Sequence, residues 1–432
     1  MKSQLSTVVV LLVATVSAHA DVTISMKPTK NMNCSGGVCT PTAKKAVLNV
    51  NALTGMLATG NVTVKSDSRS KDIEIDTALS WAGTQMLTLD SYQSIIFKKP
   101  VVVTGAGAIG MKTNDGGQNG DFSFVGKAHI EFWDITSRLL IDNTQYTLVN
   151  SVAMLASKAN YDDRAYALAR DYDAKPDGVY HDAPIHTFFG ILEGLGNHIQ
   201  NLAVTGDENS DGDALIGLDF GLSIHNFGLE HVKIKSRTLA GALVATNGAP
   251  ITNCYATGTI SGPSSLIAGG LVGDDDAVVT NSFANVSINA GPGSLLGGFA
   301  ADEQGMIINS HASGTIVSGG QSDVGGLVGT NGGKILQSYA TGELKGAAQD
   351  VIGGLVGTNG YAGIHGIVMQ SYATGAVSGG TGASVGGLIG HTEATGTGSQ
   401  SYSIGQVSGG TNTGGLIGFA DNSTGFNNMY WV

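Results

Sequence analysis

One short segment of the chain has the residue order of a calcium-binding loop. Asp207, Asn209, Asp211 and Asp213 alternate along it, and a glycine precedes the last of them. Oxygen ligands in this order converge on a hard cation such as Ca²⁺, and the glycine permits the tight turn. The twelfth position is Leu218, where a calcium loop has Glu. The segment therefore predicts either a calcium site or an acidic surface loop between coils, and we expect no other cofactor.

Five charged residues near the middle of the chain could form a catalytic site: Asp162, Asp163, Arg164, Asp171 and Asp173. A glycosidase needs two carboxyl groups about 5 to 10 Å apart. If these side chains converge in one cleft, they favour a carbohydrate-active enzyme of the lyase or hydrolase type. If they are spread over the surface, they favour a binding protein.

Other enzymatic patterns are missing or weak. None of the ten histidines lies in a His-Glu-x-x-His pair, which excludes the common zinc-peptidase motif. A pectate-type lyase needs basic groups beside acidic ones, yet Lys334 and Lys345 are the only basic residues from 241 to 432. The acidic run at 274–276 reads as a solvated turn, because adjacent strand residues point to opposite sides. The sequence thus predicts a protein that is not an enzyme.

The three cysteines divide into a pair and a single residue. Cys34 and Cys39 enclose Ser-Gly-Gly-Val, a loop short enough to close as a disulfide in an oxidising compartment. The alternative is two free thiols. Cys254 occupies a position where the repeats described below have Ser, so we expect a buried thiol there; no basic neighbour in sequence would make it reactive.

The strongest feature of the chain is a repeat. Near-copies of Gly-Gly-Leu-Val-Gly begin at seven glycines, spaced by 28, 28, 28, 28, 33 and 28 residues: Gly241, Gly269, Gly297, Gly325, Gly353, Gly386 and Gly414. A Ser-Tyr-Ala-Thr-Gly block follows in step. The apolar runs within each repeat are three to five residues long and lie between turn residues, which is typical of short strands. We therefore predict an all-β fold, a right-handed parallel β-helix with coils of about 28 residues.

Stacked coils place equivalent residues in columns along the axis, and two such columns are visible in the sequence. The first is a ladder of side-chain amides, which can hydrogen-bond from rung to rung: Asn253, Asn281, Asn309, Gln337, Gln370, Gln400 and Asn428. The second is largely aromatic: Tyr255, Phe283, His311, Tyr339, Tyr372, Tyr402 and Tyr430. We interpret it as buried stacking, with a sugar-binding platform as the alternative. Residues 199–201 and 224–226 look like weaker rungs upstream.

The rest of the chain suggests further divisions. Alternating apolar runs at 62–64, 73–75, 87–89, 101–103 and 122–124 predict a less regular solenoid over 61–144, preceded by an N-terminal segment or cap over 21–60. Residues 145–195 are expected to form an insert or a wide coil. A short helix over 151–157, capped by Asn150, is predicted within it. The repeat array itself covers 196–432.

The first twenty residues have the features of a signal peptide. Lys2 precedes an apolar run at 7–16, and the small residues around His19 predict cleavage between Ala20 and Asp21. That run is too short for a membrane helix, and no later stretch is apolar for long enough. Without Lys2 the chain has 21 basic against 34 acidic groups, a balance that disfavours nucleic acid and anionic lipid as partners.

Several of these segments resemble a known family. Residues 325–329 (Gly-Gly-Leu-Val-Gly) and 338–342 (Ser-Tyr-Ala-Thr-Gly) resemble the GLUG repeat of bacterial surface proteins. Residues 194–202 resemble the segment that leads into such arrays, and residues 140–148 resemble a strand-turn-strand unit of filamentous-haemagglutinin-type exoproteins. The resemblance covers roughly 45–432 and implies an adhesin-like β-helix of a Gram-negative bacterium. Two departures are the missing two-partner secretion domain between 21 and 62 and an ending at 429–432 that looks short for the family.

Together these patterns predict an exported structural or adhesive protein. It is expected to be secreted or on the outer cell surface, with the periplasm as another destination. Its expected partners are cell-surface glycans or proteins, or other copies of itself, which an extended repeat surface can contact rung by rung. The alternative function is a polysaccharide-active enzyme with its site in the irregular region.

Overall fold

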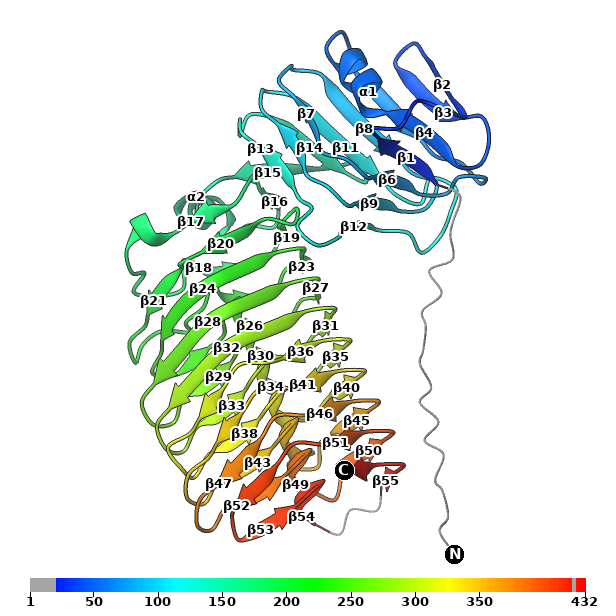
Figure 1. Cartoon of the computed structure of the whole chain (residues 1–432). Helices are drawn as coiled ribbons and strands as arrows, with labels where there is room; N and C mark the ends of the chain where they lie inside the picture. The colour runs from blue at the N-terminus through cyan, green and yellow to red at the C-terminus, as the bar shows by residue number, and fades with distance from the viewer. Residues whose placement is uncertain (1–20, 422–424) are drawn as a thin grey trace, which may run out of the picture.

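The computed structural model describes residues 21–421 and 425–432, so the predicted signal peptide up to Ala20 lies outside the described residues. The chain forms two β-solenoids that follow one another and are bent at their junction (Figure 1). Each has its own hydrophobic core. The two α-helices are α1 (Val50–Leu57) and α2 (Val152–Ala159). Among the described residues, no helix is long and apolar enough to cross a membrane.

The N-terminal solenoid has three faces of parallel strands. One face has the order β4-β1-β6-β9-β12, a second has β7-β10-β13, and a third joins β3, β5, β8, β11 and β14. Successive coils differ in length, since Ile73 pairs with Ile95 and Ile95 with Phe122, steps of 22 and 27 residues. The strands are β1 (Val22–Ser25), β2 (Met32–Ser35), β3 (Val38–Pro41), β4 (Ala46–Asn49), β5 (Val62–Lys65), β6 (Ile73–Ile75), β7 (Leu79–Trp81), β8 (Met86–Asp90), β9 (Ile95–Phe97), β10 (Val101–Val103), β11 (Ala108–Lys112), β12 (Phe122–Phe124), β13 (Ile130–Phe132) and β14 (Arg138–Ile141).

Helix α1 covers the first coil. It begins directly after β4, where the Asn49 side chain accepts hydrogen bonds from the backbone N–H groups of Asn51 and Ala52 and so caps the helix. Its buried residues Val50, Leu53 and Leu57 belong to the N-terminal core. The apolar face of the helix therefore closes the end of the solenoid, within the segment predicted as a cap.

A hairpin reverses the chain between the two solenoids. Strands β14 and β15 (Thr144–Val149) pair antiparallel, and the two residues of their turn, Asp142 and Asn143, have φ values of 45° and 68°. Two residues with positive φ form the type I′ turn that suits the twist of a two-residue hairpin. Strand β15 then pairs in parallel with β16 (Ala165–Leu168), so one sheet continues from the first solenoid into the second.

The shared sheet buries both of its faces. In β16 the side chain of Ala167 belongs to the N-terminal core, whereas Tyr166 and Leu168 belong to the core of the second solenoid. All four residues of β16 are buried, as expected for a strand covered on both sides. The second core thus lies on the opposite face of this sheet from the first.

The second solenoid is a parallel β-helix, which confirms the predicted fold. A representative coil contains β38 (Asp323–Gly325), β39 (Val328–Asn331), β40 (Lys334–Leu336), β41 (Tyr339–Ala340) and β42 (Leu344–Lys345). Val272 pairs with Ala300, Ala300 with Val328 and Val328 with Val356, so the coils stack in steps of 28 residues. We call these stacked coils the array.

The region over 145–195 is a wide coil of the same stack. Helix α2 is present there, but its cap is Ser151, whose hydroxyl accepts from the Met154 N–H at 3.1 Å, and not Asn150 as predicted. The prediction for 199–201 was also wrong. Asn201 follows β20 (His198–Gln200), which pairs with β24 (Gly228–Lys235), whereas Asn226 stacks on Asn253 at another corner.

A column of polar side chains runs inside the array. Glu303 lies between Asp275 and Asn331 in the parallel register, and all three are 0% exposed. Further members are Asp219, Asn247 and Asn359. Hydrogen bonds join Asn247 Nδ2 to Asp275 Oδ1 at 2.7 Å and Asn331 Nδ2 to Asn359 Oδ1 at 2.8 Å. We call this set the inner polar column.

Candidate ligand-binding groove at the junction of the solenoids

A groove lies where the N-terminal solenoid meets the outer surface of the array. Backbone hydrogen bonds join the two parts: Ile130 N–H donates to Leu195 O at 2.9 Å, and Phe132 N–H donates to Ala169 O at 2.7 Å. The N-terminal solenoid leans over the first coils of the array, with β12 close to β19 (Ile191–Glu193) (Figure 1). Because this overhang ends after a few coils, a concave surface is left beside it.

The inner end of the groove is a nook of about 240 Å³. Glu193 at the end of β19 and His225 at the end of β23 (Ser223–His225) are adjacent rungs on the outer face of the shared sheet. Side chains of the N-terminal solenoid complete the lining, which gathers several titratable groups from distant parts of the chain. The other lining residues are Asp121, Phe122, Ile141, Asp142, Thr144, Tyr146, Asn226 and Asn253.

Glu193 is the most perturbed group in the nook. It is 1% exposed, and its Oε1 accepts hydrogen bonds from the Leu195 N–H at 2.7 Å and from Asn226 Nδ2 at 3.1 Å. Burial raises the pKa of Glu193 to about 8, although both hydrogen bonds favour the charged form. Burial also lowers the pKa of His225. At neutral pH the nook therefore combines a protonated carboxyl group with a neutral imidazole.

The outer part of the groove has a volume of about 580 Å³ and opens along the array. Asn226 and Asn253 line both the nook and this outer part, so the two are continuous. The outer lining combines amides, one carboxylate, a hydroxyl and aromatic edges. It consists of Ser123, Phe124, Gly126, Ala128, Gly196, Asn226, Glu230, Asn253, Cys254, Tyr255, Thr257, Asn281 and Phe283.

The predicted amide ladder borders the groove and continues beyond it. Its members all have positive φ, between 50° and 55°, because they turn the chain at the same corner of each coil. Asn309 Nδ2 donates to Asn281 Oδ1 at 2.6 Å, and Gln370 Nε2 donates to Gln400 Oε1 at 3.2 Å. Except for the half-buried Asn253, these side chains are exposed. The ladder is therefore a surface row of donors and acceptors.

The aromatic column runs beside the amides. From Tyr255 to Tyr402 the neighbouring rings are parallel within 11°, with centroids 4.6 to 5.2 Å apart. Each inner ring thus covers the faces of its neighbours, and at the upper end Tyr255 lies against Gly228. A sugar that stacks on an aromatic side chain needs a free ring face. Within this column only ring edges are open, which favours the stacking interpretation over the platform.

Between these columns lies a buried row of serines. The Ser282 hydroxyl accepts from the Cys254 N–H at 3.0 Å, and Ser310 accepts in the same way from the Ser282 N–H at 3.1 Å. Cys254 takes the place of one serine, is 1% exposed and has no disulfide. Burial raises the pKa of its thiol to about 12. The environment of Cys254 is thus that of an unreactive thiol.

The structure does not gather the residues of the predicted calcium loop. Asp207, Asn209 and Asp211 are exposed, whereas Asp213 is 0% exposed and accepts from the Ser210 hydroxyl at 2.9 Å. The Asp207 carboxylate accepts from the Asn209 N–H at 2.8 Å, as in an ordinary turn. Within residues 21–421 and 425–432, no three His, Cys, Asp or Glu side chains are grouped as metal ligands. Calcium at this loop stays a prediction.

The five charged residues proposed for an enzyme are separated. Asp162 pairs with Arg164 and accepts from the Tyr166 hydroxyl, Asp171 pairs with His198, and Asp173 accepts from Asn201. Only two of the five, Asp163 and Arg164, line a common pocket. The acidic run at 274–276 alternates as expected, with Asp274 half-buried on the outer face and Asp275 inside.

The sequence did not point to the residues of the nook. Asp121 and Glu193 are far apart in the chain and meet only because the hairpin after β14 folds the array back against the first solenoid. One signal was present: Glu193 is a lone charged residue in the apolar run Gly-Ile-Leu-Glu-Gly. Such a residue needs a buried partner or a function.

Comparisons with known proteins identify no family. No protein-family model matches the chain, and no curated protein matches it. A solved IgA1 protease is 20% identical with a TM-score of 0.45, covering 59% of this chain and 21% of its own. A candidate immunoglobulin A1 protease from Bacteroides ovatus is 18% identical with a TM-score of 0.43, covering 66% of this chain and 83% of its own. This chain thus spans about a fifth of the first structure, and it is similar to both only in part of its fold.

Proposed function

We propose that this protein is exported and displays an elongated β-helix that binds cell-surface glycans in the groove at the solenoid junction. The observation that carries the proposal is the continuous groove, in which the amides of Asn226, Asn253 and Asn281 stand one coil apart beside the Glu230 carboxylate. Amide and carboxylate groups at fixed spacing are suited to the hydroxyl groups of a sugar chain. A chain that lies along the solenoid axis would meet one such group per coil.

Two further features support an exported, surface-displayed protein. Cys34 and Cys39 are bonded across the β2–β3 hairpin, and such bonds persist in oxidising compartments. The resemblance to GLUG-repeat proteins of Gram-negative bacteria points to the same location. The array also presents a long surface with few charges, on which contacts can add rung by rung.

A glycan-array screen of residues 21–432 would identify the ligand, and two double variants would locate its site. Asn253→Ala with Asn281→Ala removes two amides from the groove. Gln370→Ala with Gln400→Ala is the matched control, because these residues belong to the same column and have similar φ but lie outside the groove. We expect the groove variant to bind about tenfold more weakly, as two lost hydrogen bonds imply, and the control to bind normally. Equal losses would place the ligand along the whole ladder.

A second candidate function is hydrolysis of the bound glycan in the nook. The raised pKa of Glu193 suits a general acid, and the carboxyl groups of Asp121 and Asp142 line the same space. Glycosidases pair a protonated with an ionised carboxyl group in this way. The test is release of new reducing ends from the glycans that bind, with Glu193→Gln as the inactive variant. If these glycans stay intact during prolonged incubation, the groove only binds.

A further inference from the structure

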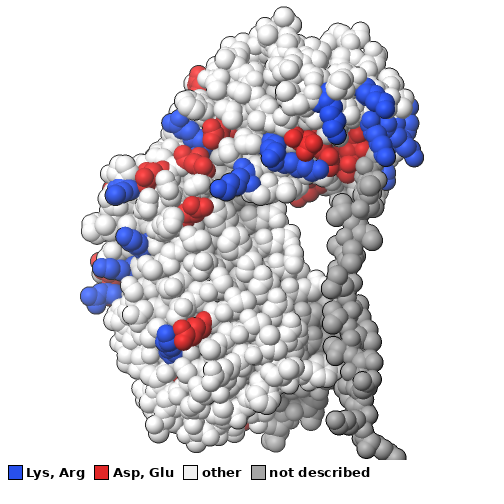
Figure 2. Space-filling view, viewed as in Figure 1, with Lys and Arg blue, Asp and Glu red and all other residues white. Residues whose placement is uncertain are grey.

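Four lysines form a basic surface at the N-terminal end of the molecule, away from the groove. Lys27, Lys30, Lys44 and Lys45 are all exposed, and no Asp or Glu occurs between residues 22 and 64. In Figure 2, Lys and Arg side chains gather over this end, whereas most of the visible surface of the array carries neither charge. We call these four residues the basic cap. It is the opposite of what the net negative charge of the whole chain suggests.

The backbone brings the four lysines together from two segments. Lys30 and Val47 exchange both backbone hydrogen bonds, at 2.9 and 2.8 Å, and Asn31 Nδ2 donates to Lys44 O at 3.0 Å. Residues 27–31 therefore run alongside 44–47, and the four ammonium groups share one patch. Lys45 has a φ of 55°, a region that a lysine rarely adopts and that favours Gly or Asn.

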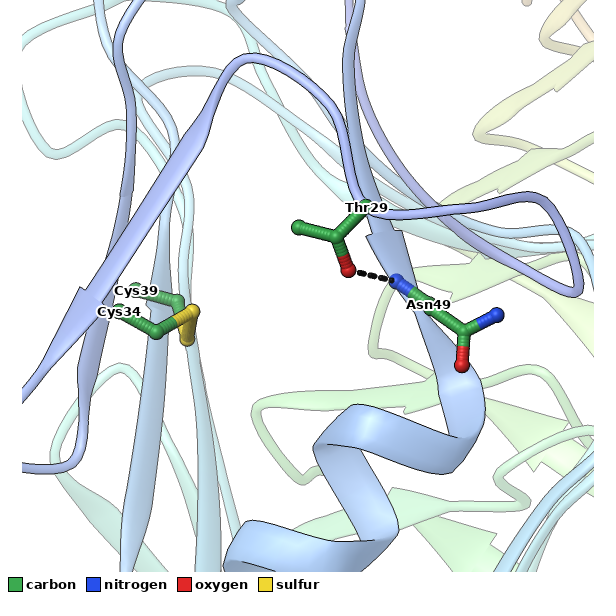
Figure 3. The surroundings of a disulfide bond; sticks show 4 residues. All are labelled: Thr29, Cys34, Cys39 and Asn49. Atoms are coloured by element: carbon green, nitrogen blue, oxygen red, sulfur yellow. Dashed lines mark hydrogen bonds between the residues drawn. A yellow bond between two sulfur atoms is a disulfide. The ribbon is translucent and has the colours of Figure 1, made fainter.

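Side chains from neighbouring elements fix the first of these segments. The Thr29 hydroxyl accepts from the Asn49 N–H at 3.0 Å, a few residues from the bonded pair Cys34 and Cys39 (Figure 3). The Asn49 side chain also donates to Met26 O and Lys27 O, both at 3.0 Å. Because Asn49 is also the cap of α1, the loop that carries Lys27 and Lys30 is tied to the helix.

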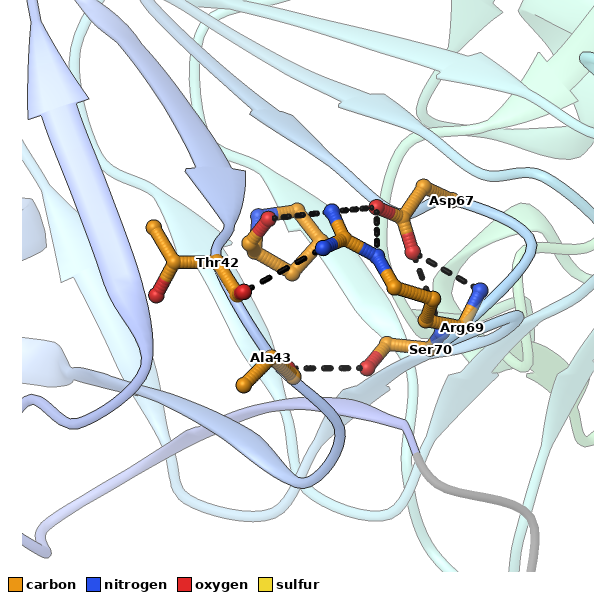
Figure 4. A network of polar contacts seen from close by, with 6 residues as sticks. Thr42, Ala43, Asp67, Arg69 and Ser70 are labelled. Carbon is orange, nitrogen blue, oxygen red and sulfur yellow. Dashed lines mark hydrogen bonds and ion pairs between the residues drawn. The ribbon is translucent and has the colours of Figure 1, made fainter.

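A second clamp holds the segment that carries Lys44 and Lys45. The Arg69 guanidinium donates to Pro41 O at 3.1 Å and to Thr42 O at 3.2 Å, and it is itself held by Asp67 (Figure 4). The Ser70 hydroxyl donates to Ala43 O. These contacts occupy the carbonyl groups just before Lys44, so the patch is held in place before any ligand arrives.

The four lysines have no acidic partner in the part of the chain that the structure describes. Two cations in the same solenoid are paired, Lys98 with Glu74 and Arg69 with Asp67, but none of the cap lysines lies within ion-pair distance of a carboxylate. Charges that are clustered, exposed and unpaired attract an anionic partner and strengthen its binding at low salt. A backbone fixed in advance lowers the entropy that such binding costs.

We propose that the basic cap binds an anionic polysaccharide, one that carries sulfate, phosphate or uronate groups at intervals. A polymer fits better than a bilayer, because between the lysines the surface is polar, with Pro28 and Thr29, and Met26 is the single large apolar side chain exposed beside them. This site is separate from the groove. One end of the molecule would attach to an anionic polymer while the array presents a surface of low charge to neutral glycans.

The test measures binding of residues 21–432 to immobilised heparin at about 0.1 M salt and at higher ionic strength. The cap variant carries Lys27→Gln, Lys30→Gln, Lys44→Gln and Lys45→Gln. The matched control removes four exposed charges elsewhere: Lys175→Gln, Lys233→Gln, Lys235→Gln and Arg237→Gln. We expect the cap variant to bind at least about tenfold more weakly with a shallower salt dependence, and the control to bind normally.

Three outcomes would overturn the proposal: no binding of the unaltered protein, equal losses in both variants, or binding to vesicles of anionic lipid but not to heparin. Replacing the four cap lysines by Arg keeps the charge and should preserve binding, and an unchanged thermal midpoint shows that each variant folds. The Asn253→Ala, Asn281→Ala variant should keep full heparin binding. Failure of the groove and failure of the cap can therefore be told apart.

Discussion

The two solenoids fill their interiors in different ways. The N-terminal solenoid packs large side chains at irregular intervals, among them Trp81, Phe97 and Phe132, and a helix closes its end. The array repeats the same small set of residues in every coil, with Gly, Ser and Ala in fixed columns and a row of buried polar groups inside. A core of unique contacts tolerates coils of different length, whereas a core of columns requires each coil to match its neighbours.

This comparison predicts that small changes of volume are most harmful in the array. A Cβ atom at Gly326 would lie 2.0 Å from the carbonyl oxygen of Gly354 in the next coil, while one at Gly60 in the N-terminal solenoid would meet nothing within 4 Å. We expect Gly326→Ala to lower the free energy of unfolding by about 3 kcal/mol, since backbone cannot move aside easily. Gly60→Ala should change it by less than about 0.5 kcal/mol. Denaturant titration of both variants measures the difference.

The inner polar column predicts a pH dependence that belongs to the array. Burial raises the pKa of Asp275 to about 6 and that of Glu303 well above its usual range. Folding therefore favours the protonated forms, so their stabilisation is complete at low pH and is lost as pH rises through the folded-state pKa values. For Asp275 alone this loss is about 3 kcal/mol. Thermal midpoints should fall between pH 5 and pH 8.

Replacing Glu303 by Gln sharpens the same prediction. The amide keeps the shape and removes a buried acid, so we expect higher stability at pH 8, on the order of 2 kcal/mol, and a flatter pH profile. Hydrogen exchange can assign the effect to the array, because amides of the N-terminal solenoid should not respond. A profile that remains as steep in Glu303→Gln would mean that other groups cause it.

The disulfide is expected to matter only in the first solenoid. Replacing Cys34 and Cys39 by Ser opens a short loop, for which the loss of chain constraint in the unfolded state is worth about 2 kcal/mol. Exchange should speed up in β2, β3 and the adjoining loops, while the array stays protected. A general loss of protection in both solenoids would contradict the view that their cores are separate.

The smallest effects should come from the exposed ladder. Ser338 is 0% exposed, accepts from the Ser310 N–H at 3.1 Å and donates to Leu336 O at 2.9 Å, so Ser338→Ala should cost about 1 to 2 kcal/mol. The neighbouring Gln337 is exposed, and Gln337→Ala should cost less than about 0.5 kcal/mol. Thermal midpoints of the two variants, measured together, test which column supports the array. Similar losses would mean that the amides contribute to stability despite their exposure.

The array could be predicted from the sequence because its order is periodic. A step of 28 residues fixes the register, and the register places Asn281 next to Asn309 and Phe283 next to His311. Periodicity does not say which columns face water, so the amides could be aligned but not placed at the surface. Where the step changes, alignment failed, and Asn201 was assigned to the wrong corner.

The junction could not be predicted, because it depends on contacts between distant segments. The nook joins Asp121 and Glu193 across a hairpin whose effect is to reverse the strands and to change the buried face of the sheet. Helix α1 was missed for a local reason. Its eight residues include Thr and Gly and follow a strand without a break, so that Asn49 ends the strand and caps the helix.

The constant register of the array also has a consequence for its evolution. Each 28-residue unit ends at the same corner at which it began, and it offers the following unit the same pattern of backbone donors and acceptors. Unequal recombination between two units would therefore remove or add whole coils without shifting any column. Gene variants that differ in copy number should encode rods of different reach that share one N-terminal solenoid, and selection could adjust that reach independently of the junction.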